Sequence, residues 1–119
     1  MKEAQIQKAI VDYLNAVLPT EYRCFAIPNG SQRTATGRPA NAVAGLTRGV
    51  PDLAIVGGVG RVFFLEVKTA KGRLSEFQSE FANWCLCKGV VPWACVRSVE
   101  DVRVALEAWK IETRECKKC

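Results

Sequence analysis

The sequence predicts an α/β domain with a mixed four-stranded sheet flanked by helices, in the order α-β-β-β-α-β-α. Two observations support this prediction: helical apolar repeats near both ends of the chain, and two apolar strands joined by a Gly-rich turn. A third helical pattern separates the last two strands, as in a crossover to a mixed sheet. The chain has 119 residues, of which 49% are hydrophobic, so we expect one domain over residues 1–110. Residues 111–119 form a basic, Cys-containing tail.

The first half of the chain is predicted to form one helix, one strand and one long loop. In residues 2–17 apolar side chains recur at helical spacing: Ile6, Ile10, Leu14 and Val17. Glu3 and Gln7 fall on the same stripe, and Pro19 closes the helix. A short strand follows at residues 22–28. Residues 29–49 are polar, Gly-containing and aperiodic, which predicts a loop of a length that is usually functional or disordered.

The second half is predicted to form a hairpin, a helix, a strand and a last helix. Strands at residues 50–56 and 61–68 are joined by Gly57-Gly58-Val59-Gly60, so they should pair antiparallel. Ser75 and Gln78 form a capping box that starts the next helix, and Gly89 ends it. Its expected apolar stripe is Phe77, Phe81 and Trp84. A strand at residues 90–96 precedes the last helix, whose expected inward residues are Val102, Leu106 and either Ala105 or Trp109.

Charge is unevenly distributed along the chain. The net charge is +5, and the excess lies between residues 23 and 73, where eight basic residues face two acidic ones, Asp52 and Glu66. Such a stretch is typical of a phosphate-binding surface, and a solvated surface explains it equally well on charge alone. No apolar run approaches the roughly 20 residues of a transmembrane helix. The N-terminal residues also lack a signal peptide's apolar core, so we expect an intracellular protein.

Composition restricts the available chemistry. The chain contains no histidine, which removes the commonest general base and His metal sites. Three of its six cysteines lie in apolar segments and are expected in the core: Cys85, Cys87 and Cys95. Cys116 and Cys119 form one CxxC. A zinc or iron–sulfur site would have to combine this pair with Cys24 or with Cys85 and Cys87, and a disulfide is the alternative.

The two acidic residues of the basic stretch lie on the two strands of the predicted hairpin. Asp52 is near the start of one strand and Glu66 near the end of the other, so antiparallel pairing brings them together. A carboxylate on a buried strand needs a partner. Lys68 is one candidate, and a divalent cation held by Asp52, Glu66 and the main-chain carbonyl of Val67 is another. The Lys68 ammonium could then orient a water or stabilise charge on a phosphate.

This set of residues resembles a known nuclease motif. Pro51-Asp52 followed by Glu66-Val67-Lys68 resembles the PD-(D/E)xK nuclease superfamily, and the predicted element order matches that superfamily's restriction-endonuclease-like core. Further matches make residues 1 to about 110 similar to the virus-type replication-repair nuclease (VRR-NUC) domain: Glu3, Gln7, Asn29, the run Gly49-Val50-Pro51-Asp52, and Gln78 in LSEFQ.

The resemblance implies a Mg²⁺- or Mn²⁺-dependent DNA endonuclease. By match of motif, Glu3, Asp52 and Glu66 line the metal site, Lys68 serves the water, and Gln78 lies nearby. Gln7 and Pro51 support the site. The resemblance also implies a phage-encoded or bacterial protein of the cytoplasm that acts as a homodimer on branched DNA such as four-way (Holliday) junctions. The residues expected to bind DNA are Asn29, Arg33, Arg38, Arg48, Lys71 and Arg73.

Several alternatives remain open from the sequence. Gln78 at the third helical position can serve the capping box or the site, and we expect only one of these, the site. Glu3 can be a dipole-favoured residue of a frayed first turn, and Asn29 a turn residue. The last helix, with Trp109, is one candidate for the dimer interface. At the level of function, the alternatives are a non-catalytic nucleic-acid-binding module and a cysteine-metal adaptor built on Cys116 and Cys119.

Overall fold

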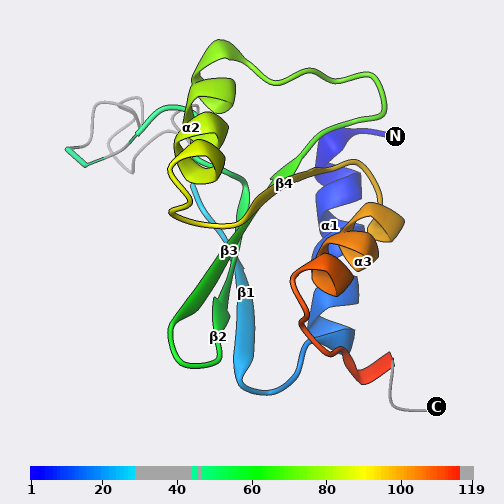
Figure 1. Cartoon of the computed structure of the whole chain (residues 1–119). Helices are drawn as coiled ribbons and strands as arrows, with labels where there is room; N and C mark the ends of the chain where they lie inside the picture. Colours follow the sequence, from blue (N-terminus) through cyan, green and yellow to red (C-terminus); the bar gives the residue numbers. More distant parts are fainter. Residues whose placement is uncertain (29–43, 46, 116–119) are drawn as a thin grey trace.

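The structure, a computed structural model, describes residues 1–28, 44–45 and 47–115. Asn29, Arg33, Arg38, Cys116 and Cys119 lie outside the described residues. The seven elements follow the predicted order (Figure 1). Their bounds are α1 Glu3–Val17, β1 Tyr22–Ala26, β2 Leu53–Gly57, β3 Arg61–Val67, α2 Glu76–Cys87, β4 Trp93–Val96 and α3 Val99–Ala108.

The four strands form one mixed sheet in the spatial order β1-β2-β3-β4. β1 pairs antiparallel with β2, and β2 pairs antiparallel with β3. α2 then crosses over, so β3 and β4 pair parallel, with Glu66 opposite Cys95 and Val67 opposite Val96. The predicted α/β class, the mixed sheet and the hairpin are therefore confirmed.

The main core lies between the sheet and the helices α1 and α3 (Figure 1). All four apolar residues predicted on α1 are buried, and α3 buries Val102, Ala105 and Leu106. The sheet contributes alternate residues from one face: Leu53, Ile55, Phe63, Leu65, Val67 and Val96. Residues 111–113 continue this packing, because Ile111 is 4% exposed and Thr113 is 5% exposed.

α2 covers the other face of the sheet. The Phe64 ring of β3 lies 5.8 Å from the Phe81 ring of α2, centroid to centroid, and Phe81 in turn lies 5.6 Å from Trp84. The stripe predicted on α2 is wrong in part, because Phe77 and Trp84 are exposed and the fully buried residues are Ala82 and Cys85. A helix that packs over one part of a sheet can leave the rest of its apolar stripe in solvent.

Two strands start later than the sequence predicts, and both have a proline just before them. β2 begins at Leu53 rather than residue 50, and β4 begins at Trp93 rather than residue 90. Proline has no N–H to donate to a ladder. The Pro92 carbonyl still accepts a hydrogen bond from Phe64 N at 2.9 Å, but regular pairing starts one residue later. β1 also stops two residues short of its predicted end, at Ala26.

Candidate active site

The β2–β3 hairpin places Asp52 and Glu66 at the same end and on the same face of the sheet. Leu53 is paired with Leu65, and Ala54 with Phe64. Asp52 is two residues from Ala54, and Glu66 is two residues from Phe64. Because side chains alternate along a strand, both carboxylates lie on the face that α2 covers.

Asp52 is fixed at the point where the hairpin ladder ends. Its Oδ2 accepts a hydrogen bond of 2.7 Å from the main-chain N–H of Val67. Its own carbonyl accepts one of 2.8 Å from Ile27 N. Pro51, which precedes it, is fully buried. The half-buried Asp52 therefore links Ile27, which follows β1, to Val67 at the end of β3. Its side-chain oxygen accepts the Val67 N–H hydrogen bond that a main-chain carbonyl would accept if the ladder continued.

Glu66 is a buried carboxyl with an incomplete set of partners. The residue is 1% exposed. Its Oε2 accepts a hydrogen bond from Gln78 Nε2 at 3.1 Å and lies 4.0 Å from Lys68 Nζ. Its Oε1 is buried, with no hydrogen-bond partner in the part of the chain that the structure describes. Burial, followed by the interaction with the Asp52 carboxyl, raises the pKa of Glu66 to about 9, and the Lys68 charge opposes this shift only in part.

Gln78 serves both the capping box and the site, so the prediction that it does only one was wrong. Its Oε1 accepts from Ser75 N at 2.8 Å, and its main-chain N donates to Ser75 Oγ at 3.1 Å. Its Nε2 remains available and donates to Glu66. An amide carries an acceptor and two donors on separate atoms, so one side chain holds the start of α2 and the carboxyl beneath it.

Gly49 allows the chain before Asp52 to pass against the first turn of α2. Its φ is +85°, a conformation that favours glycine. A Cβ atom at this position would overlap the main-chain carbonyl of Phe77 and would lie 2.9 Å from Gln78 N. This close approach brings the Gly49–Asp52 segment beside the helix turn that carries Gln78.

Lys68 follows β3 directly and lies against the carboxyl pair. Its main-chain N donates to the Val96 carbonyl at 3.0 Å, which extends the β3–β4 pairing by one bond. Its side chain is 13% exposed, and its ammonium lies 4.0 Å from Glu66 Oε2. That distance is an ion-pair contact, longer than a hydrogen bond.

Arg97 is a residue of this region that sequence reasoning missed. Its Nη1 donates to the carbonyls of Thr69 and Gly72 at 2.6 and 2.7 Å, and lies 3.4 Å from that of Ala70. One guanidinium thus holds the loop that follows Lys68. A signal was present in the sequence: Arg97 follows β4 as Lys68 follows β3, and parallel pairing puts the two residues at the same level.

The N-terminal acid is less closely bound to the site than predicted. Glu3 is exposed rather than inward-facing, because it starts the helix, and Gln7 is half-buried. The Glu3 charge nevertheless contributes to the raised pKa of Glu66, so it lies at this end of the molecule. Among the described residues no group of three or more Asp, Glu, Cys or His side chains is arranged to hold a metal. A metal-binding role for Glu3 stays a prediction.

The basic residues divide into two groups with different partners. Arg48, Lys71 and Arg73 are exposed, as a DNA-binding role would require. Arg61 belongs to the same stretch, but its guanidinium donates to Tyr22 Oη and to the Trp109 carbonyl, both at 2.7 Å, and lies over the Phe63 ring. Arg61 therefore stabilises the end of α3, so the charge of the basic stretch is not all available to a ligand.

Of two further predictions on the remaining residues, one needs correction. Cys85 is buried and Cys95 half-buried, but Cys87 is exposed and so is not a core residue. The Trp109 ring stacks on Phe63 with centroids 4.9 Å apart and is half-buried. The last helix with Trp109 as a dimer interface stays a prediction.

The residues present fit a hard divalent cation. Mg²⁺ takes carboxylate oxygens, commonly one or two, and completes its shell with waters and substrate phosphate. Asp52 and Glu66 provide two neighbouring carboxyls, and the buried Glu66 Oε1 has no hydrogen-bond partner among the described residues. A cation at this position would also favour the ionised form of Glu66, which the surrounding protein alone does not.

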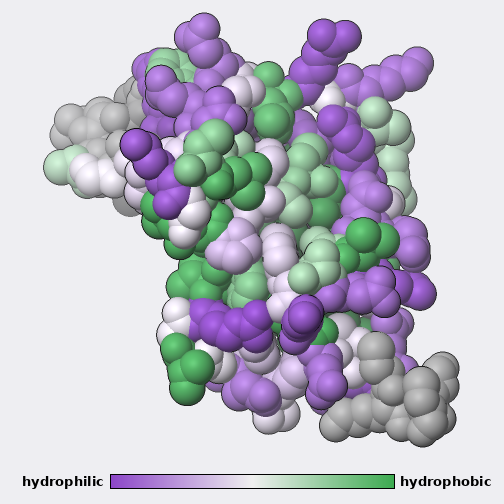
Figure 2. Space-filling view, in the orientation of Figure 1, coloured by the Kyte–Doolittle hydropathy of each residue, from purple (hydrophilic) through white to green (hydrophobic). Residues whose placement is uncertain are grey.

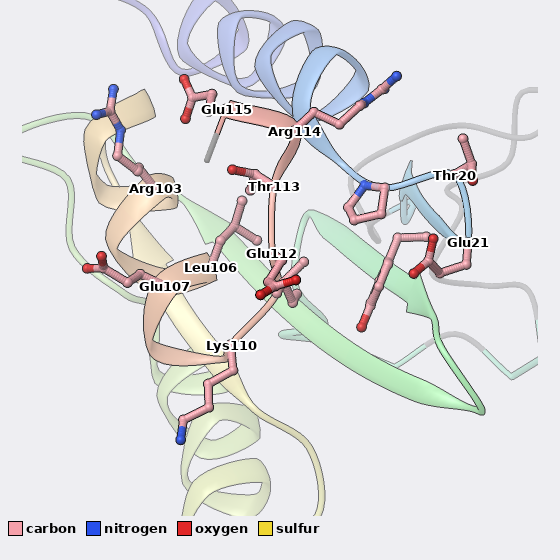
Figure 3. A pocket seen from close by; sticks show the side chains of 13 residues that line it. Thr20, Glu21, Arg103, Leu106, Glu107, Lys110, Glu112, Thr113, Arg114 and Glu115 are labelled. Atoms are coloured by element: carbon pink, nitrogen blue, oxygen red, sulfur yellow. The ribbon is translucent and has the colours of Figure 1, made fainter. Parts of the chain in front are cut away.

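A large concavity in the described part of the chain lies elsewhere. It has a volume of about 1190 Å³ and is lined by the start of β1, by α3 and by the segment after α3 (Figure 3). Its charged side chains alternate in sign, with Arg103, Lys110 and Arg114 among Glu21, Glu107, Glu112 and Glu115. None of Asp52, Glu66, Lys68 or Gln78 lines it. The carboxyl pair instead lies at an end of the sheet, where β2 begins and β3 ends.

The fold is an α/β domain with a mixed four-stranded sheet, in which the β2–β3 hairpin and the residues that flank it carry Pro51-Asp52 and Glu66-Val67-Lys68. Two solved structures share this fold. A VRR_NUC domain superposes with a TM-score of 0.59 at 19% sequence identity, covering 90% of this chain and 96% of that chain. A VRR_NUC domain protein superposes with a TM-score of 0.53 at 16% identity, covering 90% and 86%. The predicted similarity to the VRR-NUC domain is confirmed for the fold.

No protein-family model matches the sequence, and no curated protein matches it significantly. Across the described residues, no helix combines the length and the apolar character that a membrane span requires.

Proposed function

We propose that this chain is a divalent-metal-dependent endonuclease of the PD-(D/E)xK type that hydrolyses phosphodiester bonds in branched DNA, such as four-way junctions. The observation that carries the proposal is Glu66. It is a buried carboxyl beside Asp52 and Lys68, in a stretch that is otherwise basic, and one of its oxygens has no hydrogen-bond partner in the described part of the chain. A protein that only bound phosphate would gain nothing from two acidic side chains at that position.

Each residue has a distinct part in the proposed reaction. Asp52 and Glu66, with the Val67 carbonyl and Glu3, hold Mg²⁺ or Mn²⁺. When bound, that cation stabilises charge on the phosphate and lowers the pKa of water. Gln78 holds the Glu66 carboxyl in place from α2. The Lys68 ammonium orients the attacking water and stabilises negative charge as the bond to the leaving oxygen breaks.

The proposed substrate and assembly follow from the resemblance and from the charge distribution. Lys71 and Arg73 on the loop after Lys68, together with Arg48, are exposed at the same end of the sheet as the carboxyl pair, and Asn29, Arg33 and Arg38 join them in the proposal. A domain with one site cuts one strand, so paired cuts across a junction require two copies. We propose a homodimer that acts in the cytoplasm.

The test compares cleavage with binding. Asp52→Asn and Lys68→Ala should each lower cleavage of a labelled junction by at least 100-fold, on the order of the loss when one charge-stabilising group is removed, while DNA binding changes little. Lys8→Ala is the matched control, because Lys8 is an exposed lysine whose only described ion pair is with the exposed Asp12. EDTA should abolish the activity. Cleavage that persists in EDTA, or equal losses of binding and cleavage, would overturn the proposal.

A non-catalytic nucleic-acid-binding module is the second candidate. The exposed basic residues favour it, as does the lack of a three-member metal-ligand group within the described residues. It predicts binding that weakens steeply with salt and no cleavage in Mg²⁺ or Mn²⁺. A panel of labelled branched and linear DNAs incubated with each metal separates the two functions.

A further inference from the structure

The Phe77 side chain is an aromatic ring that the fold does not bury. It belongs to the same helical stripe as Phe81 and Trp84, which contact each other and, through Phe81, the sheet. Phe77 is 43% exposed, and among the described residues its ring has one cation contact, with Arg48. Hydrophobic surface lies over the region of α2, bordered by strongly hydrophilic side chains (Figure 2).

Arg48 provides a cation directly over this ring. Its guanidinium carbon lies 5.1 Å from the ring centroid, within the range of a cation–π contact. The residue is exposed and forms no ion pair within the described part of the chain. Gly49 then fixes the distance between the two segments, because its close approach to the Phe77 carbonyl leaves no room for a side chain.

The pair lies at the rim of the carboxyl site. Phe77 directly precedes Gln78, whose side chain reaches Glu66 at 3.1 Å. Gln78 reaches the Glu66 carboxyl on the sheet, whereas Phe77, one position earlier on the helix, is partly exposed. Arg48 is likewise four residues before Asp52. The ring and the guanidinium therefore flank the carboxyl pair from the side of α2.

We propose that Phe77 and Arg48 form a stacking site for one unpaired nucleobase of the DNA, next to the phosphate that is cut. This inference rests on the proposed function and specifies its substrate. An aromatic ring stacks on the face of any base, and a guanidinium adds a contact to the base or its phosphate. In an intact duplex the base faces are already stacked on their neighbours. The site therefore favours DNA with an unpaired base, as at a branch, a flap or a mismatch.

The experiment measures binding, so that it does not depend on cleavage. Two labelled DNAs of equal length are compared in Mg²⁺ with the Asp52→Asn chain: a blunt duplex, and the same duplex with a single unpaired 2-aminopurine. Phe77→Ala and Phe77→Leu are added to that chain. Leu keeps most of the apolar volume against the Gly49 segment but cannot stack, which separates stacking from packing. Val104→Ala is the control, because Val104 is 55% exposed on α3.

Both Phe77 variants should weaken binding of the unpaired-base DNA on the order of tenfold and remove the quenching of 2-aminopurine fluorescence. Their affinity for the blunt duplex should stay within about twofold. Arg48→Lys should weaken binding of both DNAs, and in each case the loss should be smaller than the loss that Phe77→Leu causes for the unpaired-base DNA.

Three outcomes would overturn the inference. Equal losses on the two DNAs would show that Phe77 only packs against the Gly49 segment. Unchanged binding and quenching would show that no base reaches the ring. A Phe77→Leu chain that behaves as the Phe77 parent would show that apolar volume, not stacking, is what matters. If the wild-type chain binds the unpaired-base DNA through Phe77 but cuts nothing, the inference stands and the proposed nuclease fails.

Discussion

Replacement of Glu66 by Gln tests the carboxyl site through stability rather than through activity. Glutamine has the shape of a protonated glutamic acid: one oxygen to accept from Gln78 Nε2, and a donor in place of the acid proton. The change therefore keeps the 3.1 Å contact and removes only the ability to ionise. Any pH dependence that disappears in the variant belongs to Glu66.

The sign and size of the effect follow from the raised pKa. The pKa of Glu66 is about 9 in the fold against an ordinary value of 4.5. Between these values the unfolded chain has lost the proton and the folded chain retains it. The folded state thus binds one more proton, and the free energy of unfolding falls as pH rises, by up to about 1.4 kcal/mol per pH unit. Total stabilities of about 5–15 kcal/mol are usual, so the loss over two units is large.

The assay is urea unfolding followed by tryptophan fluorescence at pH 5, 6, 7 and 8, in EDTA. Because the chain has no histidine, few other side chains titrate in this window. The wild-type free energy of unfolding should fall through the series, and that of Glu66→Gln should stay nearly level. Mg²⁺ should stabilise the wild type at pH 8 and the variant much less. Wild-type and variant curves that run parallel would refute a protonated Glu66.

Two other substitutions test how the site is positioned. Arg97→Ala should lower cleavage at least tenfold while binding of duplex DNA changes by less than about threefold, because the loop after Lys68 loses the hydrogen bonds that Arg97 donates to it. The control is Arg103→Ala, which replaces an exposed arginine of α3 and should leave both cleavage and binding unchanged. Equal effects of the two substitutions would contradict the role of Arg97. Gly49→Ala should lower stability by about 2 kcal/mol or more, since its φ of +85° disfavours a side chain and Phe77 occupies the space. Gly45 has a similar φ of +93°, but an added Cβ there would meet no atom of the described residues within 4 Å. In thermal unfolding Gly45→Ala should cost clearly less, and an equal loss would show that the contact with α2 does not matter.

The fold could be predicted because its signals are local. The α1 stripe, the Gly-rich turn and the Ser75 cap each specify one element from a few neighbouring residues, and the structure confirms all three. The strand ends could not be placed as well. A proline such as Pro92 can still accept a ladder hydrogen bond while it breaks the pairing pattern, so the apolar run extends beyond the strand.

The site could be predicted only in part, because side chains reach it from distant elements. Asp52 and Glu66 were accessible from hairpin pairing alone. The double use of Gln78 was not, since it depends on where α2 lies over the sheet. The exposure of Phe77 has the same origin, because periodicity identifies an apolar stripe without showing how much of it the sheet covers. The position of Arg97 beside the loop after Lys68 depends on the parallel register of β3 and β4.

Two arginines that stabilise the fold also limit where DNA can bind. Arg61 and Arg97 both donate to main-chain carbonyls, at opposite ends of β3 and β4, and so stabilise the fold. Because these guanidinium groups already donate hydrogen bonds to main-chain carbonyls, they are less available to a DNA phosphate. Among the described basic residues of the central stretch, the exposed ones near the carboxyl end of β3 are Arg48, Lys71 and Arg73. A polyanion attracted by that group meets Lys68 and the carboxyl pair next, where the remaining negative charge of the pair repels phosphate until a cation binds. The affinity of the wild type for DNA should therefore rise modestly when Mg²⁺ is added, toward that of Asp52→Asn, which lacks the Asp52 charge and should respond little to the metal. A wild-type affinity that does not depend on Mg²⁺, measured by fluorescence anisotropy at constant ionic strength, would contradict this coupling.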